Sequence, residues 1–442
     1  MKVLLVGNGA REHAIAEAIK KSNADLYAYM SKKNPGIASL CKEYEVGDIC
    51  DPDIVSIWAK SKGVELAIIG PEAPLEAGVV DALEGEGIQV ASPCKSAARL
   101  ETDKSFTRNL MKKYKIPGTP IFKIVESPEE VDELIDSLSM EVAVKPAGLT
   151  GGKGVKIQGE HLKTKEDVKN YAKEILSKGV GTINKVVIEE KLIGEEFTLQ
   201  AFVSPDEILG MPMVQDHKRA YDGDVGPNTG GMGSYTGVGY LLPFLTQDDY
   251  MFGLKVMKET VKALKKETGD SYKGPLYGQF IVTQDGPKVI EFNARFGDPE
   301  AMNVLSLFEG DFVAVMKAMV NGGLEGAPAR FLNKATVCKY LVPAGYPDNP
   351  QKGAEIKVDE DEIKRAGARV HYAAVSEENG RILTSGSRAV AVTGVADTIA
   401  EAERIAERAT RFVKGQLQHR RDIGTEDLIK KRVDHMAQIR GQ

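Results

Sequence analysis

Short, almost wholly apolar segments alternate with longer amphipathic ones along the first hundred residues. Residues 2–6, 66–69 and 88–91 have the composition of strands that are buried on both faces of a parallel sheet. The segments between them place apolar residues at helical spacing, as at Ile15 and Ile19. This alternation predicts a doubly wound α/β sheet, in which ligands bind at the carboxyl ends of the strands.

The pattern changes beyond the first hundred residues. Glycine-rich or acidic stretches now separate the strand-like segments, which lie at residues 141–145, 155–158, 185–190, 197–203, 276–282 and 288–292. Glycines and a proline within residues 322–328 mark a linker. Beyond this linker, short strands and a helical pattern over residues 398–413 predict a smaller C-terminal α/β domain.

Length and charge limit the class of protein. A chain of 442 residues suggests about three domains. The 58 Lys and Arg against 64 Asp and Glu disfavour a nucleic-acid binder. Apolar runs fall far short of the ~18 residues of a membrane span, and the N-terminus lacks the regions of a signal peptide. None of the four cysteines forms a Cys-x-x-Cys pair, and a chain this long and this poor in cysteine is not expected to carry a disulfide framework. We therefore expect a cytoplasmic protein that binds neither nucleic acid nor membranes.

A glycine turn directly follows the first predicted strand. Residues 7–12 (GNGARE) lead from this strand into a helix, where backbone amides can hold a phosphate. The turn is not a dinucleotide fingerprint, because Glu12 replaces the last glycine and the strand at 25–30 ends without an acidic residue. The turn predicts a phosphate or phosphosugar site. The alternative is a tight turn without a ligand, in which Arg11 is solvated.

A second glycine-rich loop separates the predicted strands at 141–145 and 155–158. Residues 146–154 contain four glycines and Lys153. No helix follows, so this is not a Walker loop. The loop predicts a lid whose amides and Lys153 cover a polyphosphate, with Lys145 as a second charge. The alternative is a mobile β-hairpin with solvated lysines.

Three residues in the last two predicted strands before the linker offer oxygen atoms that a hard cation accepts. They are Gln279, Glu291 and Asn293. Residues two apart in a strand share a face, so Glu291 and Asn293 would act together. Such a set suits Mg²⁺ bridging phosphate oxygens, and Arg295 could offer a planar fork to a carboxylate or phosphate.

In their order along the chain, these features resemble the ATP-grasp ligases. Several longer words resemble one family within that superfamily, the phosphoribosylamine–glycine ligases. They are GNGAREHA at 7–14, GPEAPL at 70–75, DHKR at 216–219, GPNTGGMG at 226–233 and EFNARFGDPE at 291–300. The resemblance extends from Met1 to about Asp422, and the tail after Arg420 looks specific to a lineage. Ala10 and Ala147 depart from the Gly and Asp of many members.

The resemblance implies a fold and a reaction. The expected units are a Rossmann-like domain at 1–103, the small and large lobes of an ATP-grasp domain at 104–193 and 194–328, and a C-terminal domain at 329–442. The implied reaction is the second step of de novo purine synthesis. It joins glycine to 5-phosphoribosylamine through a glycyl phosphate and gives glycinamide ribonucleotide, ADP and phosphate. The co-substrate is ATP, and the metal is Mg²⁺ or Mn²⁺.

The resemblance also implies roles for individual residues. The ATP phosphates would contact Lys104, Lys145, Gly151, Gly152 and Lys153. The adenine and ribose would contact Glu189, Glu190, Leu192 and Glu196. The metal would be held by Gln279, Glu291 and Asn293. The catalytic cations would be Lys145, Lys153 and Arg295, the last neutralising the γ-phosphate and the acyl phosphate. Asp216 would hold the ammonium of glycine, and this acceptor site would be completed by Lys218, Asn228, Thr229, Gly230 and Gly231. Phosphoribosylamine would be bound by Gly9, Arg11, Glu12, Pro71 and Glu72.

Three other functions compete with this interpretation. They are another ATP-grasp carboxylate–amine ligase, a nicotinamide dehydrogenase, and a non-catalytic nucleotide sensor. We interpret His13 and His217 as structural or orienting residues, since a neutral amine needs no dedicated base. Asp222 and Asp224 could be further metal ligands, although a solvated loop is the favoured interpretation. The expected assembly is a monomer or a homodimer.

Overall fold

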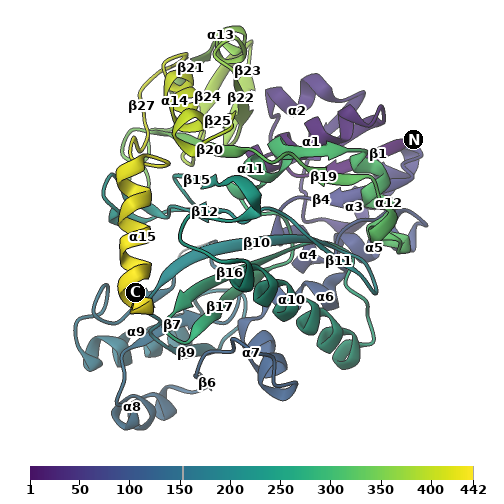
Figure 1. The fold of residues 1–442 in the computed structure, drawn as a ribbon. Coiled ribbons are helices and arrows are strands. Elements are labelled where there is room, and N and C mark those ends of the chain that lie inside the picture. The colour runs from purple at the N-terminus through teal and green to yellow at the C-terminus, as the bar shows by residue number, and fades with distance from the viewer. Residues whose placement is uncertain (152–153, 442) are drawn as a thin grey trace.

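The first hundred residues form the expected doubly wound domain (Figure 1). The computed structural model describes residues 1–151 and 154–441 of the chain. The five strands of the first domain are all parallel, in the order β3-β2-β1-β4-β5. The elements are β1 (Lys2–Val6), α1 (Ala10–Lys21), β2 (Asp25–Met30), α2 (Pro35–Leu40), β3 (Glu43–Val46), α3 (Pro52–Lys62), β4 (Leu66–Ile69), α4 (Glu72–Ala77), α5 (Val79–Gly85), β5 (Gln89–Val90) and α6 (Lys95–Thr102). Val6 pairs with Ile69, so the turns after β1 and β4 lie side by side.

The next segment forms a small lobe around an antiparallel sheet of order β6-β9-β7-β8. Its elements are α7 (Lys104–Lys113), β6 (Phe122–Val125), α8 (Pro128–Ser137), β7 (Val142–Pro146), β8 (Lys156–Ile157), α9 (Lys165–Lys178) and β9 (Val186–Glu190). Helices α8 and α9 bury Val131, Ile135, Val168 and Ile175 against this sheet, in a core separate from that of the main body. The predicted lid joins β7 to β8, and Gly152 and Lys153 of that lid lie outside the described residues.

The large lobe is built on a second antiparallel sheet, of order β11-β10-β16-β17. Its elements are β10 (Glu195–Val203), β11 (Ile208–Gly210), α10 (Gln247–Thr268), β16 (Gly274–Thr283), β17 (Gly286–Asn293), α11 (Glu300–Leu307), β18 (Phe308–Gly310), α12 (Phe312–Asn321) and β19 (Ala329–Phe331). Helix α10 covers this sheet in Figure 1. No element was predicted from the sequence for the segment that forms α10.

The C-terminal sheet extends into the large lobe. Its main path is β12-β15-β20-β25-β22, so two strands from the middle of the chain complete it. The elements are β12 (Gln215–Asp216), β13 (Arg219–Tyr221), β14 (Val225–Asn228), β15 (Gly233–Thr236), β20 (Ala335–Pro343), β21 (Glu355–Val358), α13 (Glu360–Arg365), β22 (Ala368–Tyr372), β23 (Val375–Glu378), β24 (Arg381–Thr384), β25 (Val390–Ala396), α14 (Ile399–Thr410), β26 (Val413–Lys414), β27 (Leu417–Gln418) and α15 (Glu426–Arg440). The segment that carries DHKR and GPNTGGMG is therefore anchored in this sheet.

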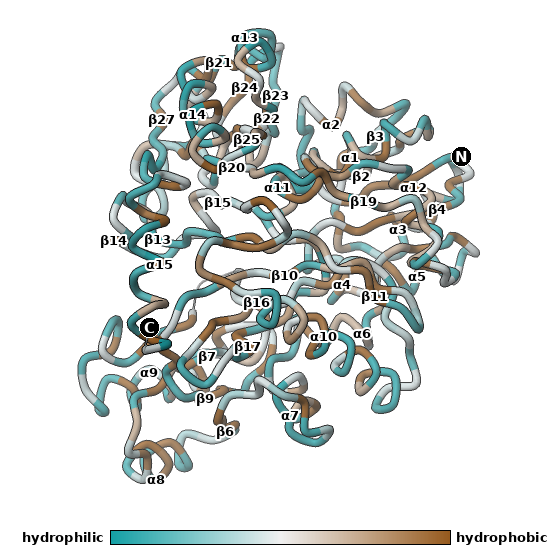
Figure 2. The backbone as a smooth tube through the Cα atoms, viewed as in Figure 1, coloured by the Kyte–Doolittle hydropathy of each residue, from teal (hydrophilic) through white to brown (hydrophobic). Residues whose placement is uncertain are grey.

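One apolar core joins the first domain to the large lobe. It contains Leu4, Ile68, Phe202, Phe280 and Met302, all buried. Figure 2 shows hydrophobic residues along the strands in the middle of the molecule and hydrophilic ones on the outer loops. Within the described part of the chain, no helix combines the length and apolar character that crossing a membrane would need. The core around the β6-β9-β7-β8 sheet shares no residue with this larger core.

Candidate functional site

The two phosphate lysines predicted outside the lid lie at the junction of the small and large lobes. Lys145 on β7 is buried, and its Nζ lies 2.7 Å from Glu189 Oε2 and 3.1 Å from the carbonyl of Ile290. Lys104, the first residue of α7, donates from Nζ to the carbonyl of Gly148 at 3.2 Å. Burial lowers the pKa of Lys104, an effect that the nearby Lys145 reinforces against neighbouring acids. The two lysines therefore differ in their partners: Lys145 forms an ion pair with Glu189, whereas Lys104 donates to a backbone carbonyl.

Glu189 was predicted to contact adenine, and here its carboxylate is held by two cations. Arg108 of α7 donates to it from Nε at 2.6 Å and from Nη2 at 3.1 Å, opposite Lys145. Burial acts to raise the pKa of Glu189, but Arg108 and Lys145 outweigh it and lower the pKa to about 2. The adenine contact stays a prediction. Sequence analysis missed Arg108, which also donates to the carbonyls of Val289 and Ile290 on β17.

The other predicted nucleotide residues follow at the end of β9 and the start of β10. Glu190 accepts from the backbone N–H of Ile121 at 2.9 Å, and Leu192 follows in the connecting segment. The Glu196 side chain is about half exposed and accepts from Gln279 Nε2 at 2.5 Å. Gly151 of the lid is exposed.

The three predicted metal ligands lie on adjacent strands. In the pairing of β16 with β17, Gln279 is opposite Glu291, and Tyr277 is opposite Asn293. Asn293 Nδ2 lies 3.5 Å from Glu291 Oε1. The Oε1 of Gln279 is buried and has no hydrogen-bond partner among the described residues. A buried carbonyl oxygen without a partner is costly unless a ligand completes it, so this oxygen fits a cation site.

The charges around Glu291 support the same interpretation. Burial disfavours its ionised form, but Lys218, Lys104 and Lys145 together lower its pKa. Across the described residues, no three His, Cys, Asp or Glu side chains are grouped in a way that could hold a metal ion. A cation at Glu291 would therefore depend on the amide oxygens of Gln279 and Asn293 as well as on the carboxylate.

Arg295 lies between two carboxylates of the first domain. Its Nη2 is 2.8 Å from Glu101 Oε1 on α6, and its Nε is 3.3 Å from Glu72 Oε2 on α4. Glu101 also accepts from the N–H of Ala294 at 2.7 Å. Burial raises the pKa of Glu101 to about 7, although Arg295 opposes the rise. Sequence analysis missed Glu101. The contact of Arg295 with Glu72 brings together a residue predicted to neutralise the transferred phosphate and one predicted to bind phosphoribosylamine.

The glycine turn after β1 closes around the side chain of Glu12. The N–H of Gly9 donates to Glu12 Oε2 at 2.5 Å, a capping contact at the start of α1. A Cβ at Gly7 would lie 2.8 Å from Glu12 Cγ and 2.8 Å from Pro71 Cδ. The absence of a side chain at Gly7 therefore makes room for an acid that already caps the helix.

Arg11 is buried, so the alternative of a solvated Arg11 is wrong. Its Nε lies 2.6 Å from Glu12 Oε1, and its Nη1 donates to the carbonyl of Phe296 at 3.2 Å. The side chain thus links the first domain to the segment after β17, the strand that carries the predicted metal ligands Glu291 and Asn293. Replacing Arg11 by alanine would cost stability, because it leaves the buried Glu12 without its cation.

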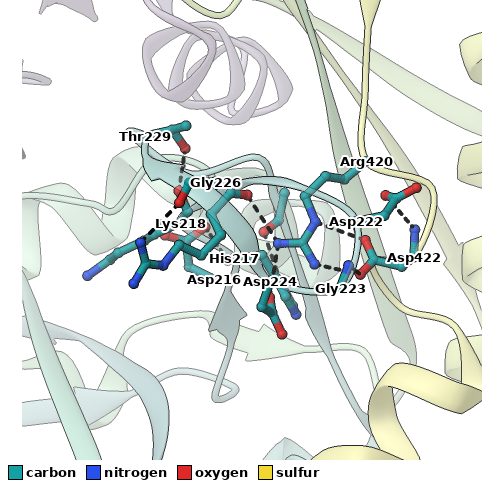
Figure 3. A network of polar contacts seen from close by, with 12 residues as sticks. Asp216, His217, Lys218, Asp222, Gly223, Asp224, Gly226, Thr229, Arg420 and Asp422 are labelled. Carbon is teal, nitrogen blue, oxygen red and sulfur yellow. Dashed lines mark hydrogen bonds and ion pairs between the residues drawn. The ribbon is translucent and has the colours of Figure 1, made fainter. Parts of the chain in front are cut away.

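The residues predicted to bind the substrate glycine form a compact group around β12 and β14 (Figure 3). The N–H of His217 donates to Asp216 Oδ1 at 2.7 Å, and Thr229 donates to the carbonyl of Lys218 from its N–H at 2.7 Å and its Oγ1 at 2.8 Å. Burial and Glu300 raise the pKa of Asp216. Burial acts to lower the pKa of Lys218, but Glu196, Glu291 and Asp216 raise it.

The loop at residues 228–231, which is also predicted to bind the substrate, is held by the C-terminal domain. Asn228 ends β14 and pairs with Arg219. Arg388 donates from Nη1 to the carbonyl of Gly230 at 2.7 Å and to that of Gly231 at 3.1 Å. Its guanidinium also lies 4.4 Å from the centre of the Tyr340 ring. Sequence analysis missed Arg388.

The loop with Asp222 and Asp224 is exposed over most of its length, but both carboxylates contact the C-terminal segment. Asp222 Oδ1 accepts from the N–H of Arg421 at 2.8 Å. Asp224 forms ion pairs with Arg420 and Arg432 of the C-terminal segment. Figure 3 shows Arg420 between Asp224 and Asp422. The Asp224 carboxylate is thus occupied by arginines and is not offered to a metal.

The two histidines considered for catalysis are buried. Burial lowers the pKa of His13 to about 3, and it also lowers that of His217 to about 3. His13 Nδ1 accepts from the backbone N–H of Tyr372 at 3.0 Å. His217 Nδ1 lies 3.3 Å from the carbonyl of Gly233. Both rings are therefore neutral at pH 7 and serve as hydrogen-bonding groups in the structure.

Comparisons with known proteins agree with the order of these domains. Family models of phosphoribosylglycinamide synthetase match the N domain at residues 1–101, the ATP-grasp domain at 102–301 and the C domain at 336–426. The phosphoribosylamine–glycine ligases of Methanosarcina barkeri and Methanocaldococcus jannaschii are 54% and 55% identical, over 100% of this chain and 100% of each relative.

Solved structures extend the comparison to the fold. The crystal structure of phosphoribosylamine–glycine ligase from Thermotoga maritima matches with a TM-score of 0.81 and 30% identity, over 96% of this chain and 100% of that one. A biotin carboxylase domain from Hydrogenobacter thermophilus, at 15% identity, matches in fold alone, with a TM-score of 0.73 over 98% of this chain and 93% of its own. The full-length relatives and the three domain models together establish that this chain belongs to the phosphoribosylglycinamide synthetase family, whose members are also called phosphoribosylamine–glycine ligases.

Proposed function

We propose that the chain joins glycine to 5-phosphoribosylamine with ATP, giving glycinamide ribonucleotide, ADP and phosphate. The observation that carries the proposal is the charge arrangement at Glu291. Lys104, Lys145 and Lys218 come from three separate segments and lower the pKa of this one carboxylate. A metal–polyphosphate complex needs such a set, with oxygen ligands for the cation and amines for the phosphates.

The first step would be phosphoryl transfer to the glycine carboxylate. A carboxylate oxygen of glycine attacks the γ-phosphorus, the bond to the β,γ-bridging oxygen breaks, and ADP leaves. Lys145 and Arg295 would balance charge on the transferred group, since preorganised cations stabilise such a transition state. A bound Mg²⁺ or Mn²⁺, held by Gln279, Glu291 and Asn293, would neutralise phosphate charge.

Glycine would be positioned by Asp216 and Lys218. Burial and Glu300 disfavour the ionised form of Asp216, so a ligand ammonium beside it would restore the charge balance. Lys218 keeps its charge through the surrounding acids and would attract the glycine carboxylate. The loop at 228–231 is anchored by Arg388 and would close the remaining side of this pocket.

The second step would be attack of the phosphoribosylamine nitrogen on the acyl carbon. The carbon–nitrogen bond forms, the acyl–phosphate bond breaks, and the nitrogen loses a proton as phosphate leaves. The neutral amine is already a nucleophile, so orientation is the main requirement. Arg11, Glu12 and Glu72 would orient the phosphosugar, and the Arg295–Glu72 contact would bring it beside the acyl phosphate.

The deciding experiment is an assay of ADP release with ATP, glycine and freshly made phosphoribosylamine. We expect ADP release only when all three are present, and the product should contain one glycine per phosphosugar. Replacing glycine by alanine or aspartate is the control for the amino acid. ADP release that continues without phosphoribosylamine, or with another amine in its place, would support a different ATP-grasp carboxylate–amine ligase.

A further inference from the structure

The last helix of the chain packs beside β10 and contacts the turn between β13 and β14. Helix α15 (Glu426–Arg440), the yellow helix in Figure 1, runs from the C-terminal domain alongside the large lobe. The C-domain family model ends at residue 426, so nearly all of this helix lies beyond it. Leu428 and Met436 bury its apolar face, and Arg440 Nη2 lies 2.6 Å from Asp249 Oδ2.

Arg432 of α15 bridges two carboxylates from distant parts of the sequence. Its Nη1 lies 3.4 Å from Glu195 Oε2, and its Nη2 donates to Asp224. Glu195 is the first residue of β10 and directly precedes Glu196, the predicted ribose ligand. His435, one turn along α15, lies 2.6 Å from the other oxygen of Glu195. One guanidinium therefore connects the nucleotide side of the site to the turn between β13 and β14.

The hairpin of β13 and β14 needs such support. These strands pair only with each other in the sheets formed by the described residues, and an isolated two-stranded hairpin is marginally stable. Lys218 directly precedes the hairpin, and Asn228 ends it. The position of the hairpin therefore sets where Lys218 and Asn228 lie in the predicted glycine pocket.

Contacts from the C-terminal segment supply much of this support. Arg420 is almost wholly buried, lies 3.0 Å from Asp224 Oδ1, and donates to the carbonyl of Arg219 at 3.1 Å. Asp422 accepts from the N–H of Gly223 at 2.9 Å (Figure 3). Arg420 thus holds one oxygen of Asp224 while Arg432 holds the other.

We propose that Arg432 of α15 is a positioning residue for the glycine pocket, acting through Asp224 on the β13–β14 hairpin. The inference rests on the proposed function. A guanidinium can bridge two carboxylates at once because its donors form a planar fork, which a lysine only partly reproduces. Loss of Arg432 leaves Glu195 and Asp224 each with one cation fewer and frees the hairpin to shift relative to Asp216.

The test compares Arg432→Ala, Arg432→Lys and Asp224→Asn with Lys431→Ala, the matched control on an exposed neighbour of the same helix. Steady-state rates are measured with glycine, ATP and phosphoribosylamine varied in turn. We expect Arg432→Ala to raise the KM for glycine about tenfold, since a small displacement of a binding group costs binding energy directly. The KM for ATP should change less than about twofold, because His435 still contacts Glu195 and the phosphate lysines lie on other elements. Arg432→Lys should restore part of the loss, and Lys431→Ala should match the unmodified protein.

The double variant Arg432→Ala/Asp224→Asn separates positioning from general loss of structure. If Arg432 acts through Asp224, the double variant should raise the KM for glycine no further than the larger single change. An unchanged KM for glycine in Arg432→Ala overturns the inference, as does an equal loss of rate with every substrate. If Arg432→Ala does not fold, the same comparison between Arg432→Lys and Asp224→Asn decides. Failure of the unmodified protein to turn over would instead overturn the proposed function.

Discussion

At the scale of single residues, Glu101 is an unusual acid because burial raises its pKa to about 7. The folded protein therefore binds a proton there that the unfolded chain, with a pKa near 4.5, has already lost. The stabilisation from this proton is complete below pH about 4.5 and is lost as the pH rises through about 7. We expect Glu101→Gln to remove this dependence, so the difference in unfolding free energy between the two proteins should change between pH 5 and 8. Urea unfolding at several pH values measures it, and parallel pH profiles would contradict the assignment.

The single carboxylate of the metal set provides a second test at this scale. Replacing Glu291 by Gln keeps its size but removes the charge opposite Gln279. We expect the rate to fall on the order of a hundredfold or more, since lost charge stabilisation in phosphoryl transfer costs several kcal/mol. The Mg²⁺ concentration for half-maximal rate should also rise. Asp285→Asn, in the exposed turn of the same hairpin, is the control. Normal turnover of Glu291→Gln at saturating metal would remove Glu291 from direct contact with the cation.

The residues that sequence analysis missed were overlooked for one reason, which is their distance along the chain from their partners. Arg108 lies 81 positions from Glu189, and Ala294 lies 193 positions from Glu101. Motif words identify groups that are adjacent in the sequence or recur in a family. Partners such as Arg108, Glu101 and Arg388 sit outside those words, because only the folded chain brings them to the site. Their charge alone gave no signal, since most charged side chains are solvated.

At the scale of elements, we predict that the lid of the small lobe closes when nucleotide binds. The small lobe has its own core, and Gly151 of the lid is exposed. We expect limited proteolysis to cut near Gly151 in the free protein and to slow markedly when ATP and Mg²⁺ are added, because closure over the phosphates buries the loop. Mass spectrometry of the fragments locates the cut. The exposed turn at Gly380 is the control, and equal protection at both places would show that nucleotide stiffens the whole protein instead of closing a lid.

Most elements were predictable from local pattern, and two kinds were not. Helix α10 carries the signals that a reader of the sequence can use: a capping box at Thr246 and Asp249, buried Val256, Thr260 and Leu264 at helical spacing, and a terminal glycine. It was overlooked, although its sequence pattern was sufficient. Strands β12 and β15 are different, because their two and four residues have no distinctive pattern and are fixed by pairing within the sheet that β20 joins. Short strands of this kind depend on tertiary partners.

At the scale of the whole molecule, strand and helix alternation correctly predicted the doubly wound domain, and the motif words correctly predicted the ATP-grasp domain and a C-terminal domain. The continuity of the C-terminal sheet with β12 and β15 could not be predicted, because sheet order between distant strands leaves little trace in one sequence. This continuity has a functional consequence. Asp216 and Lys218, which are predicted to bind the substrate glycine, are anchored in a sheet whose other strands include β20, β25 and β22 of the C-terminal domain. The C-terminal domain is therefore part of the framework of the site.

Contact between the first and last domains gives a final prediction, centred on His13. The imidazole lies between the domains, accepts from the N–H of Tyr372 at 3.0 Å, and lies 5.3 Å from the His371 ring, centre to centre. Burial lowers its pKa to about 3, so the folded protein keeps it neutral while the unfolded chain protonates near pH 6.5. Its stabilisation is therefore complete above pH about 6.5 and is lost as the pH falls, by about 2 kcal/mol between pH 6.5 and 5.

This dependence runs opposite to that of Glu101 over an overlapping range, so the two partly cancel in the unmodified protein. Comparison with His13→Gln isolates the histidine, because glutamine can still accept from Tyr372 but does not titrate. The variant should be less stable than the unmodified protein at pH 7.5, and the gap should narrow by about 2 kcal/mol at pH 5. Urea unfolding at the two pH values measures the gap. A gap that stays constant would mean that His13 is protonated in the folded protein to the same extent as in the unfolded chain, and the junction between the domains would then not depend on a neutral imidazole.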